Sequence, residues 1–587
     1  MAFCPFSSIF AVEMLLVFGG TTEGRKAAKV LEEAGSPYYY STKTGEQDIV
    51  LHHGMRIDGA LDGEAMQAFC REHGIRLMVD AAHPFAEQLH QTITNVGKAL
   101  SIPIIRYERI YPQRDKEITW IDDYDEIPRD IHSLLATTGV QTISKLKFLE
   151  AEGIKVYYRI LNRASSIVLA HQQGATDNQL CFYQDSNDID IEADAILLKE
   201  SGLSGGFVEK VNAAKARDMR IIALKRPKLS ISNVVNGPNG LRRTIERLLP
   251  EFYPLHSGLT TGTCATAAAI AATRVAWGDN SFEKNVPVLL PNGETIMVAV
   301  EYGNDYAYCI KEAGDDPDVT NGLEIRAKAE LSDSFEILGG EGVGIFTLPG
   351  FDYPPGSPAI NKAPREMMRN NIKENVRVTI SVPEGAEIAR RTFNPRLGIE
   401  GGISIIGVSG IVKPFSEEAF IDSIRKCMTV AKASGAERII INSGGKSERF
   451  VKGCYPNLPQ QAFVEYGNYI GATLQIANEL NIQQVTLGVM LGKAVKLAAG
   501  HLDTHSRKAT MDKAFIQQML DEAHCKFSIL DSQLSLAREL WEKIPQEKHQ
   551  AFADTIIRHC ETHCRQLLPN GQLTILLIDD KGHIFSR

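Results

Sequence analysis

The sequence lacks the features of several large classes of protein. No uninterrupted apolar run reaches the length of a membrane-spanning helix. A net charge of −9 and a pI near 6.0 argue against nucleic-acid binding, so a basic site for an acidic small molecule must be built locally. The 10 cysteines are scattered without paired spacing, which predicts the reduced thiols of a cytoplasmic protein.

The N-terminal segment MAFCPFSSIFAVE also lacks something, namely the basic region that opens a signal peptide. It is apolar and ends in Glu13. We therefore predict that residues 1–13 form an extension before the first strand.

What is present is the composition of a soluble globular protein, with 44% hydrophobic and 23% charged residues over 587 positions. Such a chain is too long for one core and predicts about three or four structural domains. In the first half, charged segments of helical length separate short apolar runs. This rhythm predicts an α/β fold, a two-lobed and doubly wound parallel sheet of Rossmann-like type with a break near residues 111–125. The expected strands are residues 14–18, 76–80, 102–105, 154–160, 195–198 and 220–224.

A glycine-rich turn, Gly19-Gly20-Thr21-Thr22-Glu23-Gly24, follows the first expected strand. Such a turn lets a pyrophosphate approach the backbone at a helix N-terminus. Only Gly19 and Gly24 match the dinucleotide fingerprint, so a plain α/β turn is an equal alternative. After the second strand, Ser41-Thr42-Lys43-Thr44 replaces the usual acidic ribose ligand and could contact a 2′-phosphate.

Two further motifs follow expected strands in this half. In Asp80-Ala81-Ala82-His83-Pro84-Phe85-Ala86, Asp80 could orient His83, and Pro84 fits the first turn of the next helix; a capping histidine is the alternative. In Lys199-Glu200-Ser201-Gly202-Leu203-Ser204-Gly205-Gly206, the lysine and the glycine amides could hold a carboxylate. Open α/β sheets bind ligands at this edge, where the strands end.

Together with Glu209-Lys210-Val211-Asn212-Ala213-Ala214 and Arg226-Pro227, these motifs resemble cobalt-precorrin-6A reductase over residues 14–249. The resemblance implies reduction of a double bond in a ring-contracted tetrapyrrole by NADH or NADPH. It implies that the dinucleotide lies on Gly19, Gly20, Thr21, Thr22, Glu23, Gly24, Ser41, Thr42 and Lys43. His83 and Lys199 would be catalytic, and Ser201, Gly202, Gly205 and Gly206 would line the macrocycle. The family's usual DATHPFA has Ala82 here in place of threonine.

The second half differs in texture. Residues 286–290 and 295–300 around Asn292-Gly293 predict a hairpin, and residues 307–311 and 323–331 predict further strands. Later segments, 415–434, 438–442, 460–480 and 484–491, alternate between helix and strand. We expect an α+β body with an α/β layer behind it.

An alanine-rich helix opens this half within residues 256–272, with Thr261 or Thr263 as its cap. Its first turn could bind an anionic ligand, although an ordinary capped helix packed through its small face is the favoured alternative. A last helix after Trp541 carries His559, Cys560, His563 and Cys564, for which a structural role is favoured over zinc.

Four other clusters could carry chemistry. Asp315, Asp316 and Asp318 share a turn, for which a solvated turn is favoured over a metal site. Glycines at 339, 340, 342 and 344 could let the backbone approach a ligand. Lys362 and Arg365 offer cations for carboxylates. His501 and His505 have a spacing that could bind metal on a helix, although one capping and one core histidine is favoured.

In their order, these clusters resemble cobalt-precorrin-5B C1-methyltransferase from His256 to the C-terminus. Thr260 to Cys264, Ala313 to Asp318, Gly339 to Gly344, Gly401 to Val412 and Thr504-His505-Ser506 carry the resemblance. It implies methyl transfer from S-adenosylmethionine to C1 of the macrocycle. Implied cofactor residues are Thr260, Thr261, Gly262, Thr263, Gly339, Gly340, Gly342 and Gly344, with Asp315, Asp316 and His505 as catalytic residues and Lys362 and Arg365 as substrate contacts. The usual Asn-Pro before the Pro-Arg pair reads Asn361-Lys362-Ala363 here.

The resemblances predict a bifunctional cytoplasmic enzyme of anaerobic cobalamin synthesis. We expect an extension at 1–13, a reductase module at 14–250, a linker at 251–255 and a methyltransferase module at 256–587. The expected partners are cobalt-containing precorrins. We expect no resident metal, no nucleic-acid partner and no membrane association, and the sequence leaves open whether the protein forms a homo-oligomer. One active module beside a corrinoid- or dinucleotide-binding scaffold is the alternative.

Overall fold

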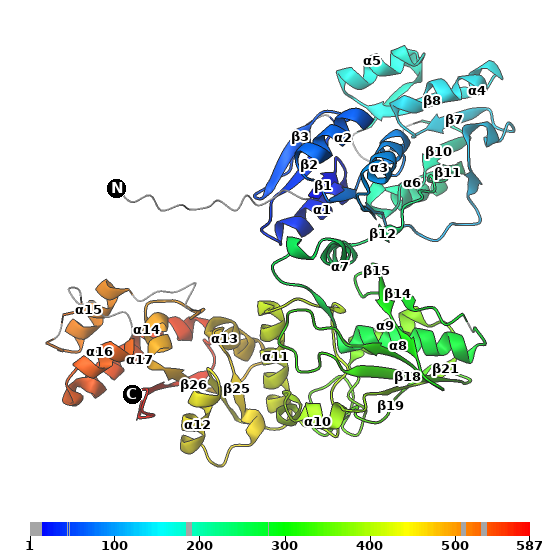
Figure 1. Cartoon of the computed structure of the whole chain (residues 1–587). Helices are drawn as coiled ribbons and strands as arrows, with labels where there is room; N and C mark the ends of the chain where they lie inside the picture. The colour runs from blue at the N-terminus through cyan, green and yellow to red at the C-terminus, as the bar shows by residue number, and fades with distance from the viewer. Residues whose placement is uncertain are drawn as a thin grey trace. The chain divides into compact units, whose positions relative to one another are not determined.

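The computed structural model describes residues 15–43, 45, 47–183, 191–279, 281–505, 512–526, 528–529 and 537–587. The predicted extension at 1–13, Thr44 and Ser506 lie outside these residues. The chain forms two compact units (Figure 1). The first comprises the chain up to Ser257 together with Pro287–Met297, and the second comprises Gly258–Val286 and Val298–Arg587.

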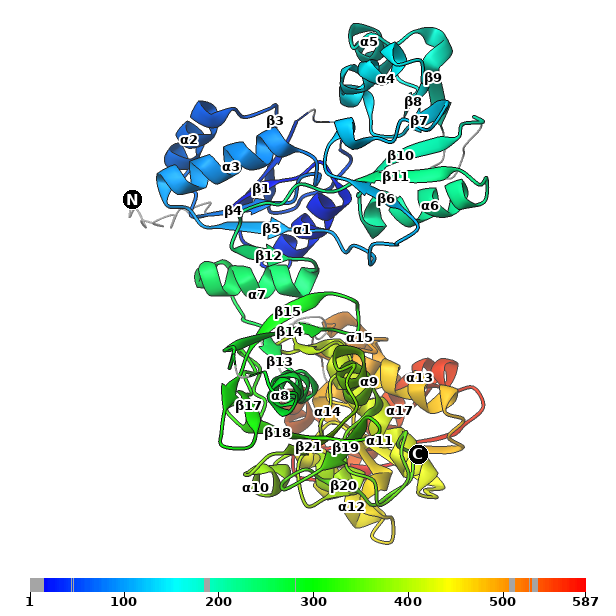
Figure 2. The same cartoon turned by 90° about the vertical axis from the view of Figure 1, so that its right-hand side faces the viewer.

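The first unit contains two sheets that form separate lobes (Figure 2). The first sheet has the order β12-β5-β4-β1-β2-β3, and all of its pairings are parallel. Its strands are β1 (Leu15–Phe18), β2 (Tyr38–Thr42), β3 (Gly54–Asp58), β4 (Leu77–Asp80), β5 (Ile104–Tyr107) and β12 (Asn233–Val235). The accompanying helices are α1 (Thr22–Glu32), α2 (Gly63–Glu72), α3 (Glu87–Leu100) and α7 (Pro238–Leu248).

The second sheet has the order β6-β11-β10-β7-β8-β9 and is also fully parallel. Its strands are β6 (Thr119–Ile121), β7 (Ser133–Ala136), β8 (Lys155–Leu161), β9 (Leu180–Tyr183), β10 (Ala195–Lys199) and β11 (Arg220–Leu224), with helices α4 (Lys147–Ala151), α5 (Ala164–Gln172) and α6 (Phe207–Lys215). The chain passes from the first sheet to the second between β5 and β6, where the sequence predicts the break. The predicted doubly wound, two-lobed architecture is confirmed.

Local sequence explains these strands. β1, β4 and β10 are near-continuous apolar runs, as expected for parallel strands covered on both faces. Pro84 precedes α3 instead of lying in its first turn, because the helix begins only at Glu87. The predicted linker at 251–255 is also ordered: Phe252 and Tyr253 are buried in the core of the first unit, and Tyr253 donates a hydrogen bond to the Val30 carbonyl at 3.0 Å.

Near the start of the second unit lies α8 (Thr261–Ala276), whose small side chains are buried from Thr261 to Thr273. Alanine lets this helix pack closely against the sheet β16-β17-β18-β21-β19. That sheet comprises β16 (Glu301–Tyr302), β17 (Ala307–Ile310), β18 (Glu324–Leu331), β19 (Glu336–Gly339) and β21 (Val376–Ser381). Short strands pair as β13 (Gly258–Leu259) with β23 (Ile411–Val412) and β20 (Ile345–Phe346) with β22 (Ile399–Glu400). The hairpin of β14 (Asn285–Leu289) and β15 (Thr295–Ala299) belongs for the most part to the first unit, which includes Pro287–Met297.

The rest of the second unit is a sheet of order β25-β24-β26-β27-β28, parallel except for its last strand. Its strands are β24 (Arg438–Asn442), β25 (Phe463–Glu465), β26 (Gln484–Met490), β27 (Gln572–Ile578) and β28 (Ile584–Phe585). The helices of this unit are α9 (Lys362–Asn371), α10 (Gly385–Ala389), α11 (Glu417–Ala433), α12 (Gly445–Cys454), α13 (Ile470–Glu479), α14 (Leu491–Ala498), α15 (Lys513–Glu522), α16 (Ala537–Lys543) and α17 (His549–Leu567).

Three expectations for the second unit are corrected. The segment 460–480 is not one helix, because β25 and a loop containing Gly467 (φ +57°) precede α13. His501 and His505 follow α14 in a loop and do not lie on a helix. The cap of α8 is Thr260, not Thr261 or Thr263, and its side chain accepts a hydrogen bond from the Thr263 amide. Among the described residues, no helix is long and apolar enough to cross a membrane.

Candidate functional sites

The glycine turn after β1 is shaped by a tyrosine from the neighbouring strand. A β-carbon on Gly24 would lie 2.6 Å from the Tyr40 hydroxyl and 2.7 Å from the Gly19 α-carbon, and one on Gly19 would collide with the Tyr40 ring. Gly20 has φ +85° and open space where a side chain would stand. Glycine is therefore required at Gly19 and Gly24, where the turn packs against Tyr40. At Gly20 the outer side of the turn is open to a ligand.

Polar side chains fix this turn. Thr21 caps α1 by accepting a hydrogen bond from the Gly24 amide at 3.0 Å, and it donates to the Ala81 carbonyl at 2.7 Å. The Gly20 amide donates to Gln47 Oε1 at 3.1 Å. A dinucleotide phosphate on this amide would replace the Gln47 contact. Gln47 belongs to no motif and cannot be recognised from the sequence.

The expected 2′-phosphate residues lie at the end of β2. Ser41 and Thr42 are buried, whereas Lys43 is exposed. The Thr42 hydroxyl donates to Asp58 Oδ1 at 2.8 Å, and Asp58 in turn pairs with Arg56 at 2.9 Å. An acidic group missing after the second strand is thus supplied at the end of the adjacent third strand. Of the predicted trio, only Lys43 presents its side chain to solvent.

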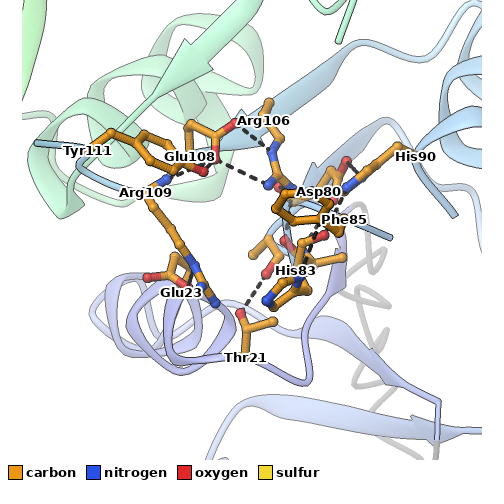
Figure 3. Close-up of polar contacts among 12 residues, drawn as sticks. Thr21, Glu23, Asp80, His83, Phe85, His90, Arg106, Glu108, Arg109 and Tyr111 are labelled. Atoms are coloured by element: carbon orange, nitrogen blue, oxygen red, sulfur yellow. Dashed lines mark hydrogen bonds and ion pairs between the residues drawn. The ribbon is translucent and has the colours of Figure 1, made fainter. Parts of the chain in front are cut away.

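Glu23 holds the two lobes of the first unit together. Its carboxylate pairs with Arg109 Nε at 2.8 Å and accepts a hydrogen bond from the Ser204 hydroxyl. Arg109 also donates to the Ser201 carbonyl at 2.7 Å (Figure 3 shows the Glu23–Arg109 pair). Because Glu23 and Arg109 are each 5% exposed at the side chain, this buried pair connects the glycine turn to the Lys199–Gly206 loop. Glu23 therefore acts on the loop, and its predicted contact with the dinucleotide would break this pair.

Asp80 does not orient His83, in contrast to the prediction. Asp80 Oδ2 lies 2.6 Å from His90 Nδ1, and Asp80 Oδ1 accepts from Arg106 at 2.9 Å. His90 Nε2 faces the His83 carbonyl at 3.0 Å (Figure 3). His90 is thus the histidine that Asp80 orients, and it supports the backbone of His83 from below. Asp80 ends β4 and His90 lies ten positions later in α3, a pairing that the local motif does not reveal.

His83 presents its ring beside Thr21 and the Arg109 guanidinium (Figure 3). Burial lowers the pKa of its imidazole to about 3, and the positive charges of Arg109 and Lys199 act in the same direction. The ring is therefore neutral at physiological pH. Its Nδ1 accepts a hydrogen bond from the Phe85 amide at 3.3 Å, so the neutral ring carries its proton on Nε2, where it can donate one hydrogen bond to a substrate.

Lys199 at the end of β10 lies over the Phe85 ring, with its Nζ 5.1 Å from the ring centroid. Burial lowers the pKa of Lys199 to about 8, assisted by the nearby charge of Lys145. A lysine with this pKa is poised to give up a proton near neutral pH. The structure therefore brings the predicted His83 and Lys199 within electrostatic range of each other.

The loop after Lys199 is held in place by ion pairs that cannot be recognised from the sequence motif. Glu200, buried, pairs with Arg114 at 2.9 Å and with Arg226 at 2.8 Å. Gly202 (φ +70°) and Gly206 (φ +67°) adopt backbone conformations that favour glycine, and a β-carbon on Gly205 would lie 2.6 Å from Arg109 Nη1. Arg226 belongs to the Arg226-Pro227 motif, but its partner Glu200 cannot be recognised from the sequence.

In the second unit, the hydroxyl and amide groups of Thr260 to Thr263 form hydrogen bonds within the protein. Thr261 Oγ1 accepts from the Ile406 amide at 2.9 Å, the Gly262 amide donates to the Ile406 carbonyl at 2.9 Å, and Thr263 Oγ1 donates to the Gly410 carbonyl at 2.7 Å. The residues are buried. Segment 404–410 thus covers the helix N-terminus, which favours the capped-helix alternative over a cofactor contact.

The glycines at positions 339–344 allow separate backbone segments to pass very close to one another. A β-carbon on Gly342 (φ +70°) would overlap the Val382 carbonyl, and one on Gly385 or Gly402 would overlap the Gly342 carbonyl. A β-carbon on Gly344 would meet the Gly402 carbonyl at 2.8 Å, and one on Gly339 would meet Pro358 at 2.6 Å. The close approach predicted from the glycines is present here between parts of the chain, and Gly340 is half-buried beside Ser381.

The acidic turn at residues 315–318 forms an ion pair with a buried lysine. Lys311, 1% exposed, pairs with Asp318 at 3.2 Å, and Asp318 also accepts from Thr320. Asp315 is exposed, and Asp316 accepts from the Phe415 amide at 3.1 Å. Asp318 is thus the structural member of the turn, a role that sequence analysis did not separate from the other two aspartates. Asp315 and Asp316 lie nearer the surface.

The predicted cations at α9 differ in setting. Lys362 is exposed and lies 3.8 Å from Glu366. Arg365 donates to the Ile360 carbonyl at 2.8 Å and covers the Tyr353 ring at 4.6 Å, and burial lowers its pKa. His505 follows Asp503, whose carboxylate accepts from the His505 amide at 3.1 Å. The structure does not bring His505 onto a helix face with His501.

The cysteine-containing helix α17 has the structural role that the sequence favours. Cys560 and Cys564 are buried, and the Cys560 thiol donates to the Ala494 carbonyl at 3.3 Å, while His559 pairs with Glu522 at 2.8 Å. The nine cysteines in the described part of the chain are all free thiols. Within the same residues, no group of three or more His, Cys, Asp or Glu side chains is arranged to hold a metal ion.

Comparison with known families agrees with this organisation. Residues 14–246 match the family "Precorrin-6x reductase CbiJ/CobK", residues 250–414 match "CbiD", and residues 503–587 match "CbiD, C-terminal domain".

Among curated relatives, a cobalt-precorrin-5B C(1)-methyltransferase of Prosthecochloris aestuarii is 39% identical over 346 residues, which cover 55% of this chain and 94% of the relative. Another of Thermus thermophilus is 40% identical over 275 residues, covering 45% and 75%.

Two solved structures are also similar. The cobalamin biosynthesis protein cbiD of Archaeoglobus fulgidus is 28% identical, with a TM-score of 0.26, over 43% of this chain and 83% of that one. A CobK precorrin-6A reductase is 17% identical, with a TM-score of 0.33, over 40% and 97%.

The sheets and the glycine turn define an α/β protein with a dinucleotide-type first unit and a second unit of α+β and α/β parts. The chain belongs to the cobalt-precorrin-5B C(1)-methyltransferase family. Its residues 14–246 match the precorrin reductase family in addition, so two enzyme families match successive parts of one polypeptide.

Proposed function

We propose that this protein is a bifunctional enzyme of cobalamin biosynthesis that methylates cobalt-precorrin-5B at C1 and reduces the resulting cobalt-precorrin-6A. The observation that carries the proposal is the presence of both enzyme families, each over its own part of one chain. The two reactions are consecutive, since the product of the second unit is the substrate of the first.

In the first unit, the reaction adds a hydride to one carbon of a double bond and a proton to the other. NADH or NADPH supplies the hydride when bound, and the glycine turn with its open face at Gly20 fits a pyrophosphate. Lys199 gives the proton, because its pKa of about 8 keeps it protonated and acidic enough at neutral pH. Neutral His83 orients the substrate, and the Ser201–Gly206 loop lines its site.

In the second unit, S-adenosylmethionine supplies an electrophilic methyl group when bound. A nucleophilic carbon of the macrocycle forms the new carbon–carbon bond, and the sulfur keeps the electron pair of the broken sulfur–methyl bond. The protein must hold the carbon in line with the sulfur, which alone supplies a large part of the rate. Arg365 and Lys362 at α9 offer cations for the substrate carboxylates.

An anaerobic turnover tests both activities. The protein is incubated with cobalt-precorrin-5B and S-adenosylmethionine, and mass and absorbance are followed before and after addition of NADH or NADPH. We expect a gain of one methyl group, then of two hydrogens. No change with a substrate that a known methyltransferase accepts would contradict the proposal. A methyl gain without reduction by either nucleotide would favour the alternative in which the first unit is a scaffold.

A further inference from the structure

The Lys199–Gly206 loop is flanked by a second lysine that the reduction described above does not use. We propose that Lys210 binds a carboxylate side chain of the tetrapyrrole that the first unit reduces, and thereby positions the macrocycle against this loop. The inference rests on the proposed reductase function and adds a substrate contact to it.

The strand order of the second sheet places a ligand crevice beside the loop. After β7 the chain adds β8 and β9 on one side of that strand, whereas β10 and β11 lie on its other side. These strands are all parallel. The loops after β7 and β10 therefore diverge at the carboxyl ends of their strands, which is where open α/β sheets bind ligands. The Lys199–Gly206 loop follows β10 and so borders this crevice.

Hydrogen bonds fix both the loop and the lysine that faces it. Ser201 Oγ donates to the Gly205 carbonyl at 3.1 Å, which closes the loop, and Arg109 donates to the Ser201 carbonyl at 2.7 Å. Lys210 in α6 directs its Nζ to the same Gly205 carbonyl at 3.5 Å. This contact is long for a hydrogen bond, so the ammonium group keeps N–H donors for a ligand.

The charge of Lys210 is not neutralised by the protein. The side chain is half-buried, and in the described parts of the chain it forms no ion pair; the neighbouring Glu209 is exposed. Burial lowers the pKa of Lys210, and the positive charges of Arg159 and Arg109 act in the same direction. A partly desolvated ammonium group among other cations costs free energy, which a bound anion would offset.

Arg109 connects Lys210 with the groups assigned to the reduction. Its positive charge acts on Lys210 and on His83, so both lie within electrostatic range of one guanidinium. Figure 3 shows Arg109 beside His83. A nucleotide phosphate is the other anion that a lysine could bind, but the turn that fits a pyrophosphate, at Gly20, follows a strand of the first sheet. Lys210 lies in the helix after β10 of the second sheet, which favours a carboxylate of the substrate.

Reductase kinetics of the full-length protein test the inference. Lys210→Met should raise the KM for cobalt-precorrin-6A by about tenfold or more, because a charge-assisted hydrogen bond is lost. It should leave kcat and the KM for the nucleotide within about twofold of the wild type. Lys210→Arg keeps the charge and should recover most of the loss. Lys215→Met is the matched control on the same helix, since Lys215 is exposed and pairs with Asp115 and Glu117.

Two kinetic outcomes contradict the inference. An unchanged KM for cobalt-precorrin-6A in a folded Lys210→Met protein overturns it. A rise in the nucleotide KM alone also overturns it, because the anion bound by Lys210 would then be a phosphate.

Lysine acetylation gives a readout that needs neither turnover nor a variant. The wild-type protein is treated with acetic anhydride with and without cobalt-precorrin-6A, in the absence of nucleotide, and the modified lysines are identified by peptide mass. Protection of Lys210 but not of Lys215 supports the inference. Protection of Lys210 by NADH or NADPH alone, or normal reduction with Lys210 unprotected, overturns it. If the tetrapyrrole protects no lysine and neither nucleotide supports its reduction, the proposed reductase function itself has failed.

Discussion

At the scale of single residues, Lys199 makes the sharpest prediction. As the proton donor, it must be protonated, so the reductase kcat should fall as pH rises through about 8, the pKa to which burial brings this lysine. Lys199→Met should lower kcat by about 10²–10⁴-fold, the usual contribution of a general acid, and abolish this alkaline limb. The measurement is the rate of nucleotide oxidation with cobalt-precorrin-6A from pH 6 to 9.

The control for Lys199 is Lys98→Met, which removes an exposed lysine of α3. It should retain both the wild-type rate and the wild-type pH profile. An alkaline limb that persists in Lys199→Met would assign the proton to another group.

We expect substitution of Asp80 to lower the stability of the protein rather than to affect catalysis directly. It is fully buried between His90 and Arg106. Asp80→Asn leaves the buried Arg106 charge without its main partner, which should cost about 3–5 kcal/mol in free energy of unfolding. Urea unfolding of the full chain, followed by a probe in the first unit, checks this. The surface change Asp125→Asn should stay within about 0.5 kcal/mol.

The pH dependence of the same carboxylate has a defined sign. Burial raises the pKa of Asp80, but the His90 hydrogen bond and the Arg106 charge outweigh it and hold that pKa below 3.8. The stabilisation is therefore present above the unfolded pKa and is lost as pH falls through the lower folded value. Acid unfolding of Asp80→Asn should consequently depend less on pH than that of the wild type. Equal acid slopes would contradict the role given to Asp80.

At the scale of elements, the glycine crossing of the second unit predicts that backbone contact limits substitution. Gly402→Ala places a methyl group on the Gly342 carbonyl, so adjacent loops must separate. We expect a loss of about 2 kcal/mol or more, in the range of overpacked cores, seen as a lower midpoint of thermal unfolding. Gly453→Ala in α12 is the matched control, since no atom lies within 4 Å of its new side chain. It should stabilise the helix by up to about 1 kcal/mol.

Elements are also where sequence reasoning succeeds best. Runs such as Leu15–Phe18 and Ala195–Lys199 are short, apolar on both faces and followed by glycine-containing loops, the pattern expected of a covered parallel strand. The segment 460–480 misled because its apolar residues continue through β25 and α13, and periodicity alone does not separate a short buried strand from a helix.

Candidate sites were predictable only where a motif is local. Gly19 to Gly24 and His83 follow β1 and β4, neighbouring parallel strands whose carboxyl ends meet at one edge, so their grouping follows from the fold class, whereas Lys199 follows a strand of the other sheet. The Glu23–Arg109 pair and the Glu200–Arg226 pair join distant parts of the chain, and no spacing rule connects such residues. The threonines of α8 were expected to contact the cofactor, but they form hydrogen bonds within the protein. A hydroxyl-rich helix start is equally consistent with such internal packing.

At the scale of the whole molecule, joining consecutive enzymes in one chain predicts restricted escape of the intermediate. A tether raises the effective concentration of the reductase unit around newly formed cobalt-precorrin-6A, because release and recapture occur within one molecule. Turnover with labelled methyl donor in the presence of added unlabelled intermediate measures this. The reduced product should carry more label than the free pool of intermediate. A mixture in which Lys199→Met chains make the labelled intermediate and wild-type chains, added after removal of the methyl donor, reduce it should yield product with the label of the free pool, because the intermediate must pass between molecules. Equal label from the wild type and the mixture would mean that the fusion confers no retention and only ensures that both enzymes are made in equal amounts.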